Sequence, residues 1–245
     1  MLKISIIIPT YQHGDTVEKC LLSLFNQTFK DYEIIVVNDG STDDTAEILE
    51  KYKDKIKIIS EENKGAPAAR NRGFKESSGE FIIFCDADVE ARPDMLQKML
   101  DALLEHKEYS FVYSSFKWGW KDFKLHEFDA EKLKRGNFIT STSLIRREHF
   151  PTVGWDESLK KFQDWDLWLT MSEEGRKGYW ISEFLFKVKP RRNGISSWLP
   201  SFFHKIPWDK IGWAPKEIKK YNEALKIIKE KHKIKEAPQS SFAHP

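Results

Sequence analysis

Two carboxylates one residue apart, Asp86 and Asp88, directly follow the apolar run 81–85. Paired carboxylates on a loop at the end of a strand can hold a hard divalent cation such as Mg²⁺ or Mn²⁺, which prefers oxygen ligands. Such a cation shares its shell with substrate phosphates and can neutralise the charge on a departing diphosphate. The same pattern also fits a solvated acidic turn, so the elements around it decide its meaning.

Three more polar clusters follow apolar runs that are predicted to be strands. They are Thr10-Tyr11 after residues 4–8, Asp39-Gly40 after residues 33–37, and Asn63-Lys64-Gly65 after residues 56–59. Helical patterns between these runs indicate βαβ units, and such sheets bind ligands outside the carboxyl ends of their parallel strands. We therefore expect all four clusters to meet at one edge of a sheet.

Side chains in these clusters have both a binding and a structural interpretation. Asp39 can accept hydrogen bonds from a base N–H or a ribose hydroxyl, or it can form an Asx-turn. Lys64 and Arg70 lie near a predicted helix N-terminus, which suits anion binding, although both also fit a solvated basic face. The sequence has no G-x-x-x-x-G-K-[ST] loop and no G-x-G-x-x-G after its first strand. These absences argue against a P-loop nucleotidase and a dinucleotide-binding dehydrogenase.

The second half of the chain differs chemically from the first. Residues 1–117 hold 15 Lys and Arg against 21 Asp and Glu, residues 118–245 hold 25 against 17, and all nine tryptophans lie after residue 117. The net charge of only +2, with no binding motif beside it, disfavours a nucleic-acid partner. After residue 109 the pattern is less regular. It predicts strands over 110–116, 138–145 and 179–188, a helix over 165–171 and a basic helix over 216–235.

The expected compartment is the reducing cytoplasm. Two cysteines, Cys20 and Cys85, cannot form a disulfide framework or a four-sulfur zinc site. No apolar run is long enough to cross a bilayer, and the first residues do not resemble a signal peptide. Cysteine-poor chains of this kind are typical of reducing compartments.

Four blocks of the sequence together resemble the family 2 glycosyltransferases, which use nucleotide-sugar donors and have the GT-A fold. The blocks are ISIIIPTY at 4–11, VVNDGSTDDT at 36–45, NKGAPAARNRG at 63–73 and FIIFCDAD at 81–88. Their order and spacing are similar to the family's over residues 3–105. The resemblance implies an α/β fold with a Rossmann-like, mostly parallel sheet and helices on both faces, plus a mixed acceptor-side region and a C-terminal helical extension.

The resemblance also implies which residues bind the donor, for which a UDP-sugar is favoured. In this role it places Pro9, Thr10, Tyr11, Asp39, Asn63, Lys64, Gly65, Arg70, Asp86, Ala87 and Asp88. Asp39 corresponds to the family's base-binding carboxylate. Asp86 and Asp88 correspond to its ligands for a divalent cation, Mn²⁺ or Mg²⁺.

The block VGWDESLKKFQDWDLWL at 153–169 resembles the family's acceptor-side block. That block usually contains a Glu-Asp pair whose Asp is the catalytic base, and by position the pair here is Gln163-Asp164. The resemblance therefore implies Asp164 as the base, and Gln163 departs from the family pattern. Asp166 is the nearby competitor, which can instead cap the following helix or orient a neighbour.

The resemblance implies an inverting single displacement, in which an acceptor hydroxyl attacks the anomeric carbon as the nucleoside diphosphate leaves. The acceptor is expected to be a glycan or a lipid-linked molecule in cell-surface polysaccharide or glycolipid synthesis. Aromatic faces stack well on sugar rings, so Trp118, Trp120 and Trp165, with Asp166, are the candidate acceptor contacts. Most of the other tryptophans are expected to pack in the core.

Residues 1–195 are predicted to form the GT-A domain, with a nucleotide-sugar half at 1–108 and an acceptor half at 109–195. Residues 196–236 are predicted to form an aromatic and basic helical extension, and residues 237–245 a disordered tail. Residues 197–235 carry ten lysines against four acids. Aromatic side chains beside lysines favour a bilayer interface, so a peripheral contact with the inner face of a membrane is one interpretation. Packing against the acceptor half and a dimer contact are the others.

Two other function classes compete with a glycosyltransferase. A sugar-nucleotide nucleotidyltransferase on a related fold usually shows a glycine-rich triphosphate loop near its N-terminus, and residues 8–11 contain no glycine. A non-catalytic nucleotide-sugar-binding module would not need all of the carboxylates at positions 39, 86, 88 and 164, which this sequence retains.

Overall fold

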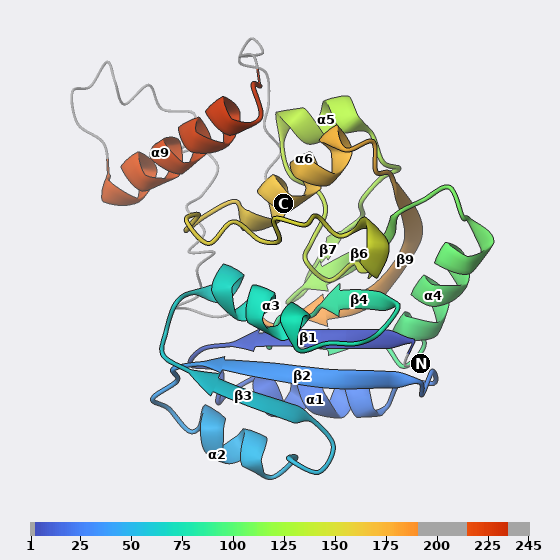
Figure 1. Cartoon of the computed structure of the whole chain (residues 1–245), viewed down its shortest axis with the longest axis vertical. Helices are drawn as coiled ribbons and strands as arrows, with labels where there is room; N and C mark the ends of the chain where they lie inside the picture. Colours follow the sequence, from blue (N-terminus) through green and yellow to red (C-terminus); the bar gives the residue numbers. More distant parts are fainter. Residues whose placement is uncertain (1–2, 191–214, 235–245) are drawn as a thin grey trace.

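The computed structural model describes residues 3–190 and 215–234. Within these ranges nine strands form one sheet in the order β3-β2-β1-β4-β8-β6-β9-β5, with β7 paired to β6. Residues 196–214 and 235–236 of the predicted extension, and the tail at 237–245, lie outside the described residues. The fold is α/β, and the sheet passes without a break from the first half of the chain into the second (Figure 1).

The first half of the sheet is parallel, as predicted. β1 (Ile4–Thr10) pairs in parallel with β2 (Tyr32–Asp39) and β4 (Phe81–Phe84), and β2 pairs in parallel with β3 (Lys57–Glu61). The β1 and β4 segments are short apolar runs because both of their faces are buried. Helices cover both faces of this half.

Alternating residues of the strands meet different helices. Ile35 and Val37 of β2 pack with Ala69 of α3 (Ala66–Lys75), whereas Ile34 and Val36 belong to the large core cluster on the other face. α1 (Val17–Phe25) and α2 (Thr45–Glu50) contribute their apolar sides to that larger cluster. In Figure 1, α3 lies in front of the sheet and α1 behind it.

The second half of the sheet is mixed. It contains β5 (Val89–Ala91), β6 (Phe111–Trp118), β7 (Lys121–Phe123), β8 (Leu144–Arg146) and β9 (Gly178–Val188). β8 runs antiparallel to both β4 and β6, β9 runs parallel to β6, and β5 runs antiparallel to β9. The helices here are α4 (Met95–Glu105), α5 (Ala130–Arg135), a single 3₁₀ turn at Arg147–His149 and α6 (Gln163–Glu173).

One predicted strand is mostly irregular. The prediction of a strand over 138–145 was wrong, because only Leu144–Arg146 pairs in the sheet. The residues before it carry buried hydroxyls, Ser141 and Thr142, and the carbonyl of Ile139 accepts a hydrogen bond from the Trp168 indole at 2.9 Å. Side-chain hydrogen bonding to neighbouring loops replaces a ladder in this segment.

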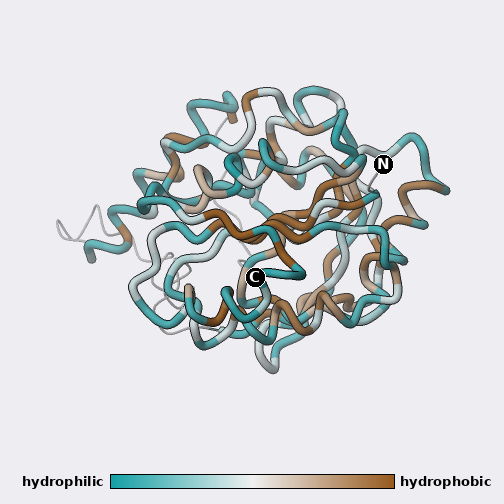
Figure 2. The backbone as a smooth tube through the Cα atoms, turned by 60° about the horizontal axis from the view of Figure 1, so that its bottom comes forward, coloured by the Kyte–Doolittle hydropathy of each residue, from teal (hydrophilic) through white to brown (hydrophobic). Residues whose placement is uncertain are grey.

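The core lies along the strands, where Figure 2 shows the most hydrophobic residues close together. The C-terminal helix α9 (Lys216–Lys231) ends four residues before its predicted end. It buries Ile218 and Ile228 and lies beside α6 in Figure 1. In the described ranges no helix combines the length and the apolar composition needed to cross a membrane.

Candidate active site

The four predicted clusters do meet at the carboxyl edge of the parallel strands. The register places Thr10 of β1 beside Asn38, and Asp39 at the end of β2 beside Glu61. The chain leaving β4 stays next to β1, because the Cys85 amide donates to the Ile7 carbonyl at 2.9 Å. Asp86 and Asp88 therefore follow the strand that neighbours β1.

Asp39 organises the loop that precedes α3. It is 2% exposed, and its Oδ1 and Oδ2 accept the backbone N–H groups of Lys64 and Gly65, each at 2.8 Å. Gly65 has φ +97°, a conformation that favours glycine. Lys64 thus contacts the cluster through its backbone, while the residue itself is exposed. A ligand at Asp39 would use the remaining lone pairs of a carboxylate that is already held in place.

A residue that the sequence analysis missed joins the first two clusters. Gln12, with φ +56°, follows Tyr11, and its side-chain amide donates to Thr42 Oγ1 at 2.8 Å. Its Oε1 accepts the backbone N–H of Asp43 at 3.0 Å. Tyr11, next to Gln12 in the sequence, is 46% exposed, whereas the Thr10 hydroxyl is buried without a hydrogen-bond partner. The Asx-rich turn at 38–44 was the available signal for such loop pairing.

Arg70 is buried near the N-terminus of its helix, which excludes the interpretation of a solvated basic face for this residue. It lies one turn inside α3, is 6% exposed, and stacks its guanidinium 4.6 Å from the centroid of the Trp155 ring. Its Nη2 donates to Asp86 Oδ1 at 2.8 Å and its Nη1 to Gln163 Oε1 at 3.2 Å. The departure at Gln163 therefore adds a neutral acceptor for Arg70 rather than another negative charge.

The Asp86 carboxylate is held on both oxygens. Arg70 contacts one, and the Ser141 hydroxyl donates to the other at 3.1 Å. Asp88 is half-buried, and its backbone carbonyl accepts from the Lys189 amide at 2.9 Å. Two carboxylates form an oxygen donor set that fits a hard divalent cation. In the part of the chain that the structure describes, no three His, Cys, Asp or Glu side chains gather into a metal site.

Asp164 lies in the first turn of α6 and takes part in the same electrostatic cluster. Burial raises the pKa of Asp164, Arg70 opposes that shift, and Asp86 reinforces it. The side chain nevertheless keeps some exposed surface. A carboxylate with a raised pKa is a candidate general base, which is the role that the sequence analysis predicted for Asp164.

Two of the residues proposed to contact the acceptor are committed to the fold. Trp165 is 4% exposed and donates its indole N–H to the Leu133 carbonyl at 2.6 Å. Asp166 is also 4% exposed and accepts from His232 and Lys231 of the C-terminal end of the chain. These contacts argue against the predicted role of both residues, because each side chain is buried and already hydrogen-bonded within the protein.

The tryptophans of the β6–β7 hairpin are different. Trp118, at the end of β6, is partly exposed, and Trp120, in the turn, is 94% exposed. Trp118 pairs in register with Val188, and the next residue of β9's chain, Lys189, donates its amide to the carbonyl of Asp88. The hairpin therefore begins close to the segment that carries Asp86 and Asp88.

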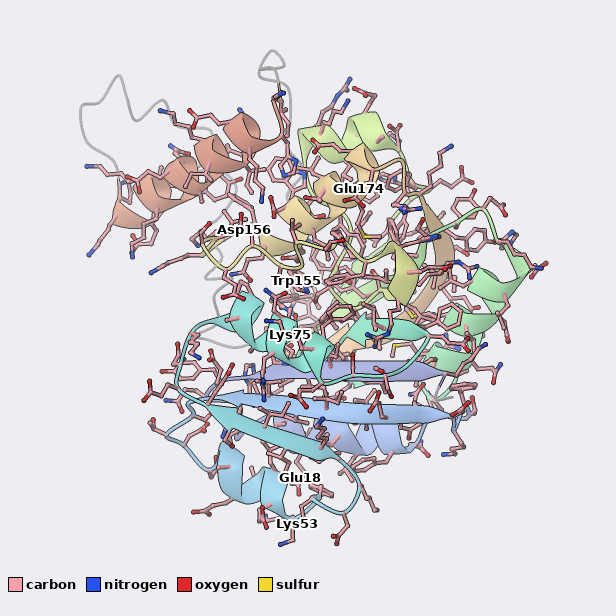
Figure 3. The ribbon with its side chains drawn as sticks, in the orientation of Figure 1. Glu18, Lys53, Lys75, Trp155, Asp156 and Glu174 are labelled. Atoms are coloured by element: carbon pink, nitrogen blue, oxygen red, sulfur yellow. The ribbon has the colours of Figure 1, made fainter. Side chains whose placement is uncertain are left out.

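The loop that carries Trp155 is fastened to α3 by Asn71. The Asn71 amide donates to the Trp155 carbonyl at 2.9 Å and to Glu157 at 2.8 Å, and its Oδ1 accepts the Trp155 N–H at 2.8 Å. Figure 3 shows Trp155 between α6 and α3, with Asp156 on the side of α9. Asn71 belongs to the third sequence block, but nothing in its spacing pointed to this partner.

Solved structures with similar folds include one bacterial and one archaeal enzyme. Against the crystal structure of S. aureus TarS 1-349 in complex with UDP-GlcNAc, the TM-score is 0.70 at 23% identity, covering 82% of this chain and 64% of that one. Against the mannosyltransferase PcManGT from Pyrobaculum calidifontis in complex with GDP-Man and Mn²⁺, it is 0.64 at 19% identity, covering 91% and 69%. These likenesses support the GT-A fold.

Sequence relatives carry glycosyltransferase names. The putative teichuronic acid biosynthesis glycosyltransferase TuaG of Bacillus subtilis is 28% identical over 79% of this chain and 81% of its own length. The uncharacterized glycosyltransferase YibD of Escherichia coli is 41% identical over 42% of this chain and only 31% of its own length. Residues 5–155, more than half of the chain, match the family described as glycosyl transferase family 2. With that match and the GT-A fold, this chain belongs to glycosyl transferase family 2.

Proposed function

We propose that the protein transfers a sugar from a nucleotide-sugar donor, with a UDP-sugar favoured, to a hydroxyl of a glycan or lipid-linked acceptor. The observation that carries this proposal is the cluster in which Arg70 binds Asp86 and Gln163 next to Asp164. The candidate base, Asp164, and Asp86, a candidate ligand of a phosphate-side cation, both interact with this one arginine. The name of TuaG supports a role in polysaccharide synthesis.

The donor class rests on chemistry and on the ligands of similar structures. TarS was solved with UDP and UDP-GlcNAc, and PcManGT with GDP-Man and Mn²⁺. In this chain Asp39 and the exposed ring of Tyr11 suit a nucleoside, and Asp86 and Asp88 would hold Mn²⁺ or Mg²⁺. When bound, the cation supplies positive charge to the diphosphate leaving group.

The chain's own residues account for the rest of an inverting displacement. The Asp164 carboxylate takes the proton of the acceptor hydroxyl as that oxygen attacks the anomeric carbon. Arg70 fixes the carboxylate of Asp86 and adds positive charge on the phosphate side. Trp118, with the more exposed Trp120 beside it, offers an aromatic surface for acceptor sugars.

We also propose that the protein acts in the cytoplasm at the inner face of a membrane. The part of the basic extension that the structure describes, α9, carries exposed lysines at positions 216, 219, 220 and 226. Binding to anionic vesicles should weaken with added salt, since salt screens such attraction. Triple charge reversal at Lys219, Lys220 and Lys226 should lower co-sedimentation, and equal sedimentation of both proteins would leave the packing and dimer-contact interpretations.

The experiment that tests the function is a thermal-shift screen of UDP-sugars and GDP-mannose with and without Mn²⁺, followed by turnover of each stabilising donor. A ligand that binds the native state raises its stability. We expect a UDP-sugar to stabilise the protein with Mn²⁺ and to release UDP. Release of pyrophosphate from a nucleoside triphosphate would indicate a nucleotidyltransferase, and binding without turnover of any acceptor or water would indicate a binding module.

A further inference from the structure

The residue before the catalytic helix has an unusual backbone. Phe162, at the N-cap of α6, has φ +61° and ψ +27°, the left-handed region that a bulky side chain rarely adopts. It immediately precedes Gln163 and Asp164, and no side-chain hydrogen bond caps this helix. The direction of the first turn of α6 therefore depends on what holds Phe162.

The C-terminal helix α9 supplies one of the contacts that hold it. The ring of Tyr221 packs edge-on against the ring of Phe162, with centroids 5.1 Å apart and an interplanar angle of 76°. Trp165 packs against the same phenyl ring at 5.8 Å and 78°. Phe162 thus makes aromatic contacts with both its own helix and α9.

The end of α9 makes a second, polar attachment to α6. His232 is 2% exposed at its side chain, and its Nε2 lies 2.8 Å from Asp166 Oδ1 while its Nδ1 lies 3.0 Å from Glu173 Oε1. Lys231 adds ion pairs to Asp166 at 2.8 Å and to Asp156 at 2.6 Å. Asp166 and Glu173 are seven residues apart, so they share one face of the helix.

Asp164 lies on a different side of α6 from this attachment. Residues two positions apart on a helix point about 200° apart around its axis. Asp166 meets α9, whereas Asp164 interacts with the charges of Arg70 and Asp86. The indole N–H groups of Trp165 and Trp168 fasten α6 to the segment 133–139.

We propose that α9 positions the base, with Tyr221 and His232 as positioning residues that act through Phe162 and Asp166. The proposal rests on the proposed role of Asp164. Displacing a catalytic group by about 1 Å can cost on the order of 100-fold in rate. Neither Tyr221 nor His232 is among the residues proposed to bind the donor, the cation or the acceptor, so their loss should lower kcat and leave donor binding intact.

The test compares four variants of the full chain. Tyr221→Ala and His232→Ala should lower kcat about 10-fold or more, with the KM for the donor that the wild type turns over changed less than about threefold. Tyr221→Phe keeps the ring and should restore kcat. Asn222→Ala, an exposed change on the same helix, is the matched control and should match the wild type. Unchanged kcat in both alanine variants, or equal losses in Tyr221→Ala and Tyr221→Phe, would overturn the proposal.

Hydrogen–deuterium exchange tests the geometry without relying on turnover. In both alanine variants, peptides covering 156–164 should exchange faster, while peptides covering 32–39 should not, and the affinity for UDP with Mn²⁺ should stay unchanged. Faster exchange confined to α9 would overturn the positioning role. If the wild type turns over no nucleotide sugar, the proposed function fails, and the exchange result still decides whether α9 holds the first turn of α6. His232→Gln replaces the alanine variant if the latter does not fold.

Discussion

Asp164 and Asp166 stand two positions apart on α6 and have different surroundings. Asp164 is near Arg70 and Asp86, whereas Asp166 forms a buried ion pair with His232. One carboxyl group can therefore act as a base while the other is already neutralised by its partners. Their separation by a helix rotation of about 200° is the physical reason for this division.

Asp164→Asn should lower kcat by about 10² to 10⁴, because an amide cannot take the proton from the acceptor hydroxyl. The substitution should leave UDP affinity nearly unchanged. In the wild type, kcat should rise with pH through the raised pKa of Asp164 and then reach a plateau, since only the deprotonated carboxylate can act as the base. Steady-state kinetics across weakly acidic pH measure both effects. An active Asp164→Asn beside an inactive Asp166→Asn would move the base to Asp166.

Asp88→Asn should keep the fold and abolish the Mn²⁺-dependent part of UDP affinity. We expect a smaller loss for Asp86→Asn, because both Asp86 oxygens are already engaged by Arg70 and Ser141. Calorimetric titration of UDP with and without Mn²⁺ measures the difference. If the Asp88→Asn protein kept the wild-type Mn²⁺-dependent affinity for UDP, Asp88 would be excluded as a metal ligand.

At the scale of elements, the site depends on segments that are far apart in the sequence. α3 contributes Arg70 to Asp86 on one side and Asn71 to the Trp155 loop on the other. Arg70 also contacts this loop directly, because its guanidinium stacks on the indole ring of Trp155. One helical turn of α3 thus connects the segment of Asp86 with the loop of Trp155.

Asn71→Ala should destabilise the protein by about 1–3 kcal/mol, because it leaves the Trp155 N–H and carbonyl without their partner. The loop should also exchange amide hydrogens faster. Urea unfolding measures the stability change, with Lys75→Ala, an exposed change on the same helix, as the control (Figure 3). Equal stability of the two variants would show that the loop is held by its packing alone.

At the scale of the whole molecule, α9 is joined to the rest by a charge cluster as well as by apolar burial. The cluster comprises His232 and Lys231 on α9, Asp166 and Glu173 on α6, and Asp156 in the loop. Burial disfavours the charged form of His232, but hydrogen bonds to Asp166 and Glu173 outweigh it and raise the pKa of His232.

The pH dependence of stability follows from that sign. A raised pKa in the folded state means that the His232 contribution is complete below its unfolded pKa, about 6.5, and is lost as pH rises through the folded value. The stability difference between the wild type and His232→Gln should therefore be larger at pH 6 than at pH 8.5. Urea unfolding at both pH values measures it. A difference that grows with pH would show that His232 is neutral in the folded protein.

Strand runs and polar clusters in the sequence determined the parallel half of the sheet and the place of the site. Short apolar segments read as buried strands, and the carboxyl ends of neighbouring parallel strands must meet at one edge. The positions of Asp39, Asp86 and Asp88 followed from that rule alone. Local patterns suffice in this half of the sheet because each strand and its neighbour belong to the same kind of βαβ unit.

Only the tertiary structure decided how the site is held together. Arg70 binds Gln163 across 93 residues, Asn71 binds the Trp155 loop across 84, and His232 binds Asp166 across 66. Nothing in a linear pattern distinguishes a solvated arginine or a helix-capping aspartate from a buried partner in such a pair. The burial of Trp165 and Asp166, which argues against their predicted contact with an acceptor, has the same cause, because burial depends on which distant elements pack against a side chain.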